Sequence, residues 1–177
     1  MKKVARWTLV GLGAATVAAA AYAVHDLRSN GFMMLQACVE TYPRPAAWIC
    51  EQSLFSEHPT PQEVAEMNQR AGALFAVHQV KKESDARRFL AHYIKAGLDI
   101  NAIDQSNGQR WTALHLVAGD ADPGAVRVLL EHGADVTLKD ANGKTPVDRA
   151  REQHAKHPTP ESEEVLKLLE SRQGEAR

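Results

Sequence analysis

The chain has 177 residues, of which 44% are hydrophobic, and a formal net charge of −1 from 21 basic and 22 acidic side chains. This length and composition fit one globular domain of ordinary size and exclude a disordered polymer. Three of the basic residues precede residue 24, so the remainder holds 18 basic and 22 acidic residues, a net charge of about −4. Because phosphate binding requires a basic face, this balance argues against DNA or RNA as the main partner.

The first 24 residues are patterned as an export signal, with three basic residues before the uncharged run 7–24. As a helix this run spans roughly 27 Å, slightly less than the apolar part of a bilayer. Residues 21–23 form an A-x-A cleavage site, which favours a removable signal peptide. No clear helix breaker precedes that site, which favours a retained single-pass anchor. Both interpretations predict that residues 25–177 are exported, either soluble in the periplasm or tethered to the inner membrane by residues 7–24.

The two cysteines, Cys38 and Cys50, flank a proline-rich turn at residues 42–45. The prolines should end the helices on both sides of this turn. The cysteines are equally far from Arg44 at its centre, so the two would face each other across an antiparallel hairpin. A disulfide there would stabilise the fold by roughly 3 kcal/mol in the chain-entropy model. The alternative is a pair of small buried side chains, but the export signal favours the disulfide.

Residues 25–72 lack repeat character and are predicted to be helical. We expect one helix near 30–41, a second near 45–56, and a third running from Pro61 towards Gln79. Thr60 can cap the third helix, Pro61 suits its first position, and Glu63 completes the capping-box spacing. One side of this helix carries an apolar stripe: Val64, Met67, Ala71, Leu74, Phe75 and His78.

A short sequence motif in the second half of the chain recurs at a fixed interval. Thr112-Ala113-Leu114-His115 returns as Thr145-Pro146-Val147-Asp148, and the run Leu-Leu-Glu-His-Gly-Ala-Asp at 129–135 lies between them. These residues, at a period of about 33 positions, resemble the ankyrin repeat, a helix-turn-helix unit joined to the next by a β-turn finger. Such repeats supply a binding surface rather than reaction chemistry.

The resemblance implies an all-α fold, a short ankyrin-repeat solenoid of about three repeats at 73–104, 105–139 and 140–172. A helical capping region (25–72) and an N-terminal hydrophobic signal or anchor helix (1–24) would precede the repeats, and a frayed tail (173–177) would follow them. The first repeat is degenerate, with extra length at 81–84 between its helices. In the third, residues 157–160 lengthen the connection by about six residues, and a polar outer face suits a terminal repeat.

Five residues take structural positions of the family pattern. Thr112 caps the inner helix of the second repeat, and Thr145 with Pro146 begins that of the third. His115 occupies the family's histidine position, which implies bonds to neighbouring backbone rather than a catalytic or metal-binding role. Gly133 permits the left-handed backbone that ends the outer helix.

The finger between the first and second repeats is enlarged. From Gly97 to Thr112 it holds three residues more than the interval from Gly133 to Thr145. We expect it to contact a protein partner through Asp104, Asn107, Arg110 and Trp111, since Trp and Arg are enriched in binding hot spots. For Trp111 the alternative is that its ring folds onto the neighbouring finger. On the next finger the candidates are Asp140, Asn142 and Lys144, although turn chemistry also explains an Asp-Asn-Gly sequence.

No catalytic, cofactor or metal-binding motif is recognisable. His154 and His157 are close enough in sequence to permit a metal site with a third ligand, but a solvated loop beside prolines is the simpler interpretation. We therefore expect a monomeric, non-enzymatic binder of another protein in the bacterial periplasm or envelope. Small exported bacterial ankyrin proteins include immunity proteins and stress-tolerance factors. The alternatives are a small metal-binding protein or enzyme that uses region 25–72 and histidines such as His78 or His92, and a membrane-associated scaffold.

Overall fold

The computed structural model describes residues 31–78 and 80–175, which form helices and turns. Over these residues no β-strand is present, and the one isolated bridge pairs Ile103 with Thr112. The described part therefore agrees with the all-α prediction. The predicted signal or anchor segment 1–24 lies outside the described residues. Within 31–78 and 80–175, none of the helices combines the length and hydrophobicity needed to cross a bilayer.

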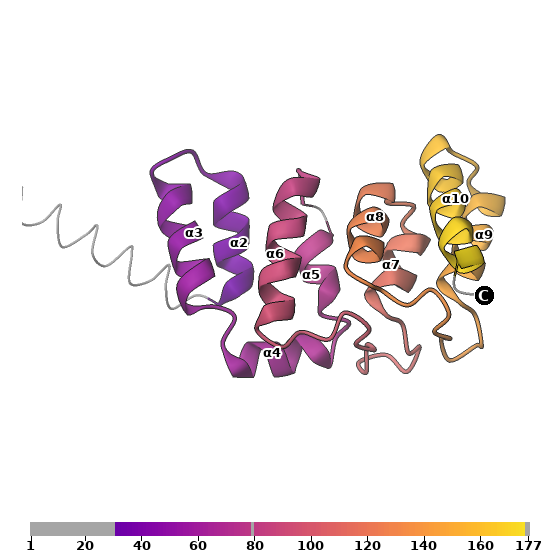
Figure 1. The fold of residues 1–177 in the computed structure, drawn as a ribbon, viewed down its shortest axis with the longest axis horizontal. Coiled ribbons are helices and arrows are strands. Elements are labelled where there is room, and N and C mark those ends of the chain that lie inside the picture. Colours follow the sequence, from indigo (N-terminus) through magenta and orange to yellow (C-terminus); the bar gives the residue numbers. More distant parts are fainter. Residues whose placement is uncertain (1–30, 79, 176–177) are drawn as a thin grey trace, which may run out of the picture. The chain divides into compact units, whose positions relative to one another are not determined.

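The chain divides into two compact units, one ending at His58 and the other beginning at Pro59. The first unit is a hairpin of α2 (Phe32–Thr41) and α3 (Ala46–Glu57) (Figure 1). A disulfide joins Cys38 to Cys50 with their Cα atoms 6.1 Å apart. Leu35 and Leu54 are fully buried beside it. The hairpin and its disulfide thus match the arrangement that the spacing around the proline turn predicts.

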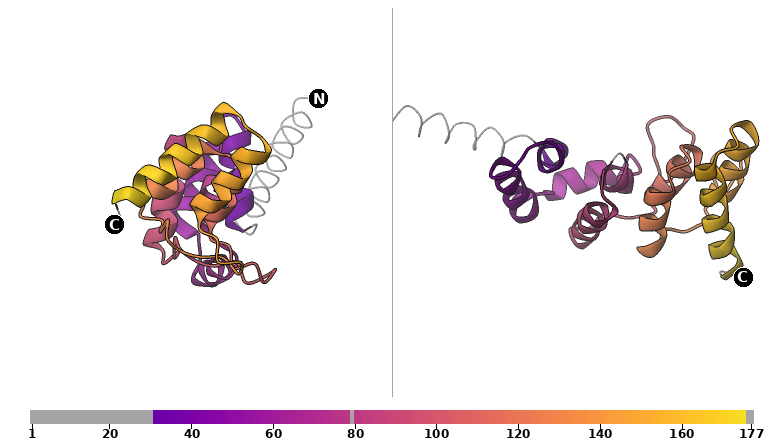
Figure 2. Two further views of the ribbon diagram at one scale, coloured as in Figure 1. Left: turned by 90° about the vertical axis from the view of Figure 1, so that its right-hand side faces the viewer. Right: turned by 90° about the horizontal axis from the view of Figure 1, so that it is seen from above.

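The second unit contains three helical pairs preceded by one short helix. The short helix is α4 (Pro61–Asn68); the pairs are α5 (Ala73–Val77) with α6 (Glu83–Lys95), α7 (Ala113–Gly119) with α8 (Pro123–Glu131), and α9 (Pro146–Lys156) with α10 (Pro160–Glu175). The inner helices α5, α7 and α9 contact one another in sequence, as do the outer helices α6, α8 and α10. Figures 1 and 2 show these pairs side by side, with the finger loops together at one edge of this unit.

Side-chain caps fix where several helices begin, among them the inner helices α7 and α9. Thr60, Thr112 and Thr145 each accept a hydrogen bond from the backbone N–H three residues later, and in each case that later side chain bonds back to the cap. Asp122 caps α8 by accepting from the Ala125 N–H at 2.9 Å. Each such cap contributes about 1 kcal/mol to helix stability. The repeated caps on α7 and α9 place the helix starts, and therefore the fingers, at the same end of both inner helices.

The core of the second unit lies between the inner and outer helices. Fully buried side chains come from every pair: Phe89, Leu90, Tyr93, Leu114, Val117, Val126, Leu129, Val147, Val165 and Leu169. On the outer helices these residues recur three or four positions apart, so each helix turns one apolar stripe inward. Stacking of the pairs buries the stripes continuously, which explains why a single repeat would not be stable alone.

The predicted continuous helix from Pro61 towards Gln79 is wrong, because the chain turns between α4 and α5. Ala71 has a left-handed φ of 53°. A Cβ on Gly72 would lie 2.5 Å from the Met67 carbonyl oxygen, so the backbones approach more closely there than a side chain allows. The sequence shows an unbroken apolar stripe across this turn, because residues before, within and after it are all buried: Met67, Ala71 and Ala73. Hydrophobic spacing alone therefore did not reveal the break.

The predicted capping region 25–72 is divided between the two units. Helix α4 belongs with the repeats, where the Asn68 amide donates to the Gly97 carbonyl at 3.2 Å and accepts from the Asp99 N–H at 2.8 Å. The Gln105 N–H donates to the Gln69 carbonyl at 3.0 Å. The end of α4 thus supports the first finger. Capping of the repeats by the α2–α3 hairpin stays a prediction.

Two smaller differences concern element ends. Helix α6 begins at Glu83, so residues 83 and 84 are helical rather than part of a lengthened loop. Helix α10 continues to Glu175, and the predicted frayed tail therefore includes helical residues 173–175. Residues 176–177 lie outside the described part.

Gly133 offers a test of the backbone requirement at the end of α8. Its φ is +90°, and no atom lies within 4 Å of the position that a Cβ would take, so a substitution there strains the backbone without a steric clash. Gly133→Val should lower the free energy of unfolding by about 1–2 kcal/mol. Gly174→Val is the matched control, because its Cβ also meets open space but its backbone is helical. Urea denaturation of both variants checks this, and equal stabilities would contradict the assignment.

Candidate protein-binding site

The first finger (residues 98–111) is closed at its base by a backbone hydrogen bond of 2.8 Å from the Asp104 N–H to the Trp111 carbonyl. The Asp104 carboxylate accepts from the Ser106 N–H at 2.8 Å and from the Asn107 amide at 3.2 Å. The Asn107 side chain in turn accepts from the Gln109 N–H at 2.9 Å. Asp104 and Asn107, predicted as contacts, therefore also order the loop. These bonds connect residues 104–109 of the finger to one another.

Arg110 lies on this finger in an unusual backbone conformation. Its φ is +60°, in the left-handed region that favours glycine, and its side chain is exposed. A non-glycine residue costs roughly 1–2 kcal/mol in this region. Non-glycine residues held in such conformations cluster at functional sites, where the surrounding structure compensates for the strain. The prediction that Arg110 contacts a partner is consistent with this geometry.

Trp111 packs against the neighbouring second finger (residues 134–144), which is the alternative that the sequence left open for this residue. Its indole N–H donates to the Asp140 carboxylate at 3.3 Å. The guanidinium carbon of Arg149, on α9, lies 4.5 Å from the centroid of the Trp111 ring. Trp111 is half-buried between these partners. It joins the two fingers and carries a cation on its face.

Asp140 is only 5% exposed and shapes the second finger instead of presenting a contact. One of its oxygens accepts the backbone N–H groups of Asn142 at 2.8 Å and Lys144 at 2.9 Å. Burial alone would raise the pKa of Asp140, but these hydrogen bonds and the Trp111 indole hold it below its usual value. Asn142 is exposed, whereas the Lys144 ammonium pairs with Glu152. Of the three predicted contacts on this finger, Asp140 is buried, Lys144 is paired but 42% exposed in its side chain, and Asn142 is exposed.

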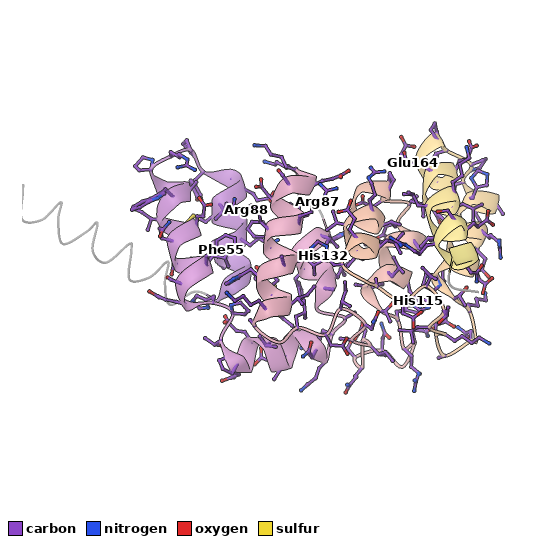
Figure 3. The ribbon with its side chains drawn as sticks, viewed as in Figure 1. Phe55, Arg87, Arg88, His115, His132 and Glu164 are labelled. Atoms are coloured by element: carbon purple, nitrogen blue, oxygen red, sulfur yellow. A yellow bond between two sulfur atoms is a disulfide. The ribbon has the colours of Figure 1, made fainter. Side chains whose placement is uncertain are left out.

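His115 connects the second repeat to the second finger. It is fully buried at the finger end of α7 (Figure 3). Its Nε2 lies 3.1 Å from the Lys144 carbonyl oxygen, and its Nδ1 lies 3.2 Å from the Thr112 backbone nitrogen. The carbonyl requires a proton on Nε2, and the Thr112 N–H requires a free lone pair on Nδ1. The ring is therefore the neutral Nε2–H tautomer, in the structural role that the family position implies.

The other histidines lie in separate places. His154 Nδ1 is 2.8 Å from the Ser162 hydroxyl, and His157 ends α9. His78 ends α5 and lies 3.9 Å from Asp120, while the His92 ring is tilted against Tyr93. Over the described part of the chain, no group of three or more His, Cys, Asp or Glu side chains is placed to hold a metal ion.

Sequence reasoning missed Arg149, although one signal was available. At the equivalent position one repeat earlier, the inner helix carries Leu116. A charged residue at an apolar position of the repeat indicates a special environment. That environment is the Trp111 ring, which is distant in the sequence and which only the stacking of α7 and α9 brings close.

The buried imidazole predicts how stability depends on pH. Burial lowers the pKa of His115 from its usual 6.5, and the hydrogen bond to the Lys144 carbonyl only partly offsets this. The unfolded chain therefore binds a proton that the folded chain excludes, so the free energy of unfolding should fall as pH decreases below 6.5. The slope should reach at most about 1.4 kcal/mol per pH unit.

Urea denaturation between pH 7.5 and 5 measures this slope. His115→Gln should be less stable at pH 7.5 but should show a flatter dependence on pH, since it has lost the titrating group. His157→Gln, which replaces an exposed histidine, should retain the parental slope. A parental slope in His115→Gln would disprove the role assigned to this ring.

Comparison with known proteins supports the repeat assignment. A sequence model of the family described as ankyrin repeats (many copies) matches residues 93–150. A putative ankyrin repeat protein of Pyrobaculum aerophilum is 59% identical over 39 residues, which cover 22% of this chain and 14% of that protein.

Two much longer proteins match this chain over only a small part of their own length. E3 ubiquitin-protein ligase Ufd4 of Drosophila melanogaster is 45% identical over 49 residues, 28% of this chain and 2% of the ligase. E3 ubiquitin-protein ligase hecd-1 of Caenorhabditis elegans is 35% identical over 68 residues, 38% of this chain and 2% of the ligase. The similarity to these relatives is thus confined to a small part of each. Together with the recurring sequence motif and the stacked helical pairs, the family match shows that residues 93–150 of this chain are ankyrin repeats.

Proposed function

We propose that the chain is a non-enzymatic binding module that presents its first finger to a protein partner outside the cytoplasm. Ankyrin repeats suggest protein–protein interaction in general. The observation that carries the more specific proposal is Arg110, an exposed cation held at a left-handed φ on a finger that is otherwise fixed by hydrogen bonds. Fixing a contact residue before binding reduces the entropy lost on association.

The distribution of ion pairs supports the finger as the contact. On the outer helices, Arg87 bonds to Glu83 at 2.9 Å and Glu131 at 2.6 Å, and Arg127 bonds to Glu83 at 2.9 Å and Glu164 at 2.7 Å. Figure 3 labels Arg87 and Glu164 in this network. The bond from Arg127 holds the pKa of Glu83 below its usual value.

Arg110, in contrast, makes no ion pair within the described residues. The charges of this network are therefore occupied by one another, whereas the cation on the first finger remains free for a partner. A charge that already has a partner contributes little to a new interface, because its first pairing must be given up.

The partner is best identified by site-specific photo-crosslinking. A photoreactive amino acid at Gln105, whose side chain is exposed on the first finger, should crosslink to the partner in intact cells. The same probe at Lys156, at the opposite end of α9, should not. Mass spectrometry of the crosslinked product would decide whether the partner is a toxin, as for an immunity protein, or an envelope component, as for a stress-tolerance factor.

Arg110 separates binding from folding in a second test. Arg110→Glu should weaken binding of the crosslinked partner at least about tenfold, or 1.4 kcal/mol, because it reverses the charge on the finger. Arg110→Gly should also weaken binding but should not lower the melting temperature, since glycine tolerates the φ of +60°. Lys156→Glu makes the same change of charge away from the fingers and should bind normally. Parental affinity in both Arg110 variants, measured by calorimetry, would refute the proposal.

Export is the second part of the proposal. The basic cluster and uncharged run at residues 1–24 support it, and so does the Cys38–Cys50 disulfide, since such bonds persist in oxidising compartments. In bacterial cells the two thiols should resist alkylation unless a reductant is added, while a Cys38→Ser, Cys50→Ser double variant provides the baseline. Alkylation of the parent without reductant would contradict export. The mass of the mature N-terminus distinguishes a cleaved signal from a retained anchor.

A small metal-binding protein or enzyme is the alternative function. No specific observation within the described residues favours it, and metal analysis of the purified chain is the direct test. Stoichiometric zinc or haem would replace the present proposal.

A further inference from the structure

We propose that Arg149, stacked on Trp111, is a receptor for a carboxylate side chain on an acidic segment of the protein partner. This inference rests on the proposed function and adds the chemistry of the partner. Arg149 lies on α9 and Trp111 on the first finger, so the site is formed by two repeats.

The charge of Arg149 is unmatched within the described residues. Four other arginines of the repeats lie within 4.0 Å of a carboxylate: Arg87, Arg88, Arg127 and Arg151. Arg149 is partly buried, yet within the described residues it makes no ion pair and its Nε has no hydrogen-bond partner. Withdrawing a charge from water without a counterion is unfavourable, and a partner's carboxylate would remove that penalty.

The Arg149 guanidinium is already oriented by the Trp111 ring. Its carbon lies 4.5 Å from the centroid of the Trp111 ring, and the ring is itself fixed by the indole bond of 3.3 Å to Asp140. A cation on an aromatic face offsets part of the cost of desolvation but satisfies no N–H donor. Both oxygens of Asp140 are already used within the fingers, so this carboxylate is not the missing acceptor.

Gly119, at the end of α7, leaves room for the Arg149 guanidinium. A Cβ added to Gly119 would lie 3.3 Å from the Arg149 Nη2, so a larger residue there would press on the guanidinium. Arg110, the residue before Trp111 on the first finger, is an exposed cation. The planar fork of a guanidinium matches a carboxylate in two parallel hydrogen bonds. The Arg149 guanidinium on the indole ring, with Arg110 exposed on the same finger as Trp111, therefore fits an acidic peptide segment better than a basic or neutral one.

The test is a titration of the isotope-labelled full chain, monitored by NMR at the Trp111 indole N–H and the Arg149 Nε–H. The probe is an acetylated and amidated hexaglutamate peptide, and the matched control is the corresponding hexaglutamine peptide. We expect both signals to shift in a saturable way with hexaglutamate. Adding about 0.5 M NaCl should weaken this binding, because the attraction is electrostatic. Hexaglutamine should leave both signals unchanged. Equal responses to the two peptides, or no response to either, would overturn the inference.

Variants of α9 assign the effect to one residue. Arg149→Gln should lower the affinity for hexaglutamate at least about tenfold, and Arg149→Lys should be intermediate, since an ammonium keeps the charge but lacks the fork. Arg151→Gln is the control, because Arg151 lies on the same helix but pairs with Glu170 at 2.7 Å. It should bind hexaglutamate as the parent does. If Arg149→Gln fails to fold, Gly119→Ala, which crowds the guanidinium without removing its charge, takes its place.

Binding of the crosslinked partner distinguishes failure of this inference from failure of the proposed function. If Arg110→Glu weakens partner binding while folded Arg149→Gln does not, the first finger is the contact but the carboxylate receptor is wrong. If neither variant weakens binding, both proposals fail.

Discussion

The hydrogen bonds of one buried neutral imidazole set the geometry of the binding surface. His115 donates to the Lys144 carbonyl of the second finger and accepts from the Thr112 N–H at the start of its own helix. The bond to Thr112 is buried and the bond to Lys144 is partly buried, so loss of either would leave a backbone group poorly satisfied. The second finger is thereby fixed to the second repeat. The indole of Trp111, which bonds to Asp140 on that finger, then fixes the first finger to the second.

The charged residues serve two purposes on different sides of the repeats. Along the outer helices, carboxylates and guanidinium groups alternate from α6 to α8 to α10, and Arg87 and Arg127 each meet two acids. Such pairs are individually weak at a surface and gain strength as a network. At the fingers the pattern differs, since Arg110 and Arg149 lack an acid within the described residues. Arg110 and Arg149 are therefore available to a partner.

Much of the fold could be predicted because the repeat encodes it locally. Capping residues, prolines at first helical positions and Gly133 each act within one helical turn, so their effects are readable from neighbouring positions. The break between α4 and α5 could not be read this way. Gly72 is required by the close approach of the Met67 backbone, a contact whose cause is the folding of α4 against the end of the first repeat. The apolar pattern is identical with or without that turn.

The candidate site likewise combines features that could be predicted from the sequence with contacts that could not. The sequence by itself determined the repeat type, the helix starts, the enlarged finger and the residues that it carries, since all of these follow from composition and spacing within a single repeat. Only the tertiary structure decided that Asp140 is buried, that Trp111 lies against the next finger, and that Arg149 covers its ring. The physical reason is that these contacts join different repeats, and their partners are chosen by how the inner helices stack.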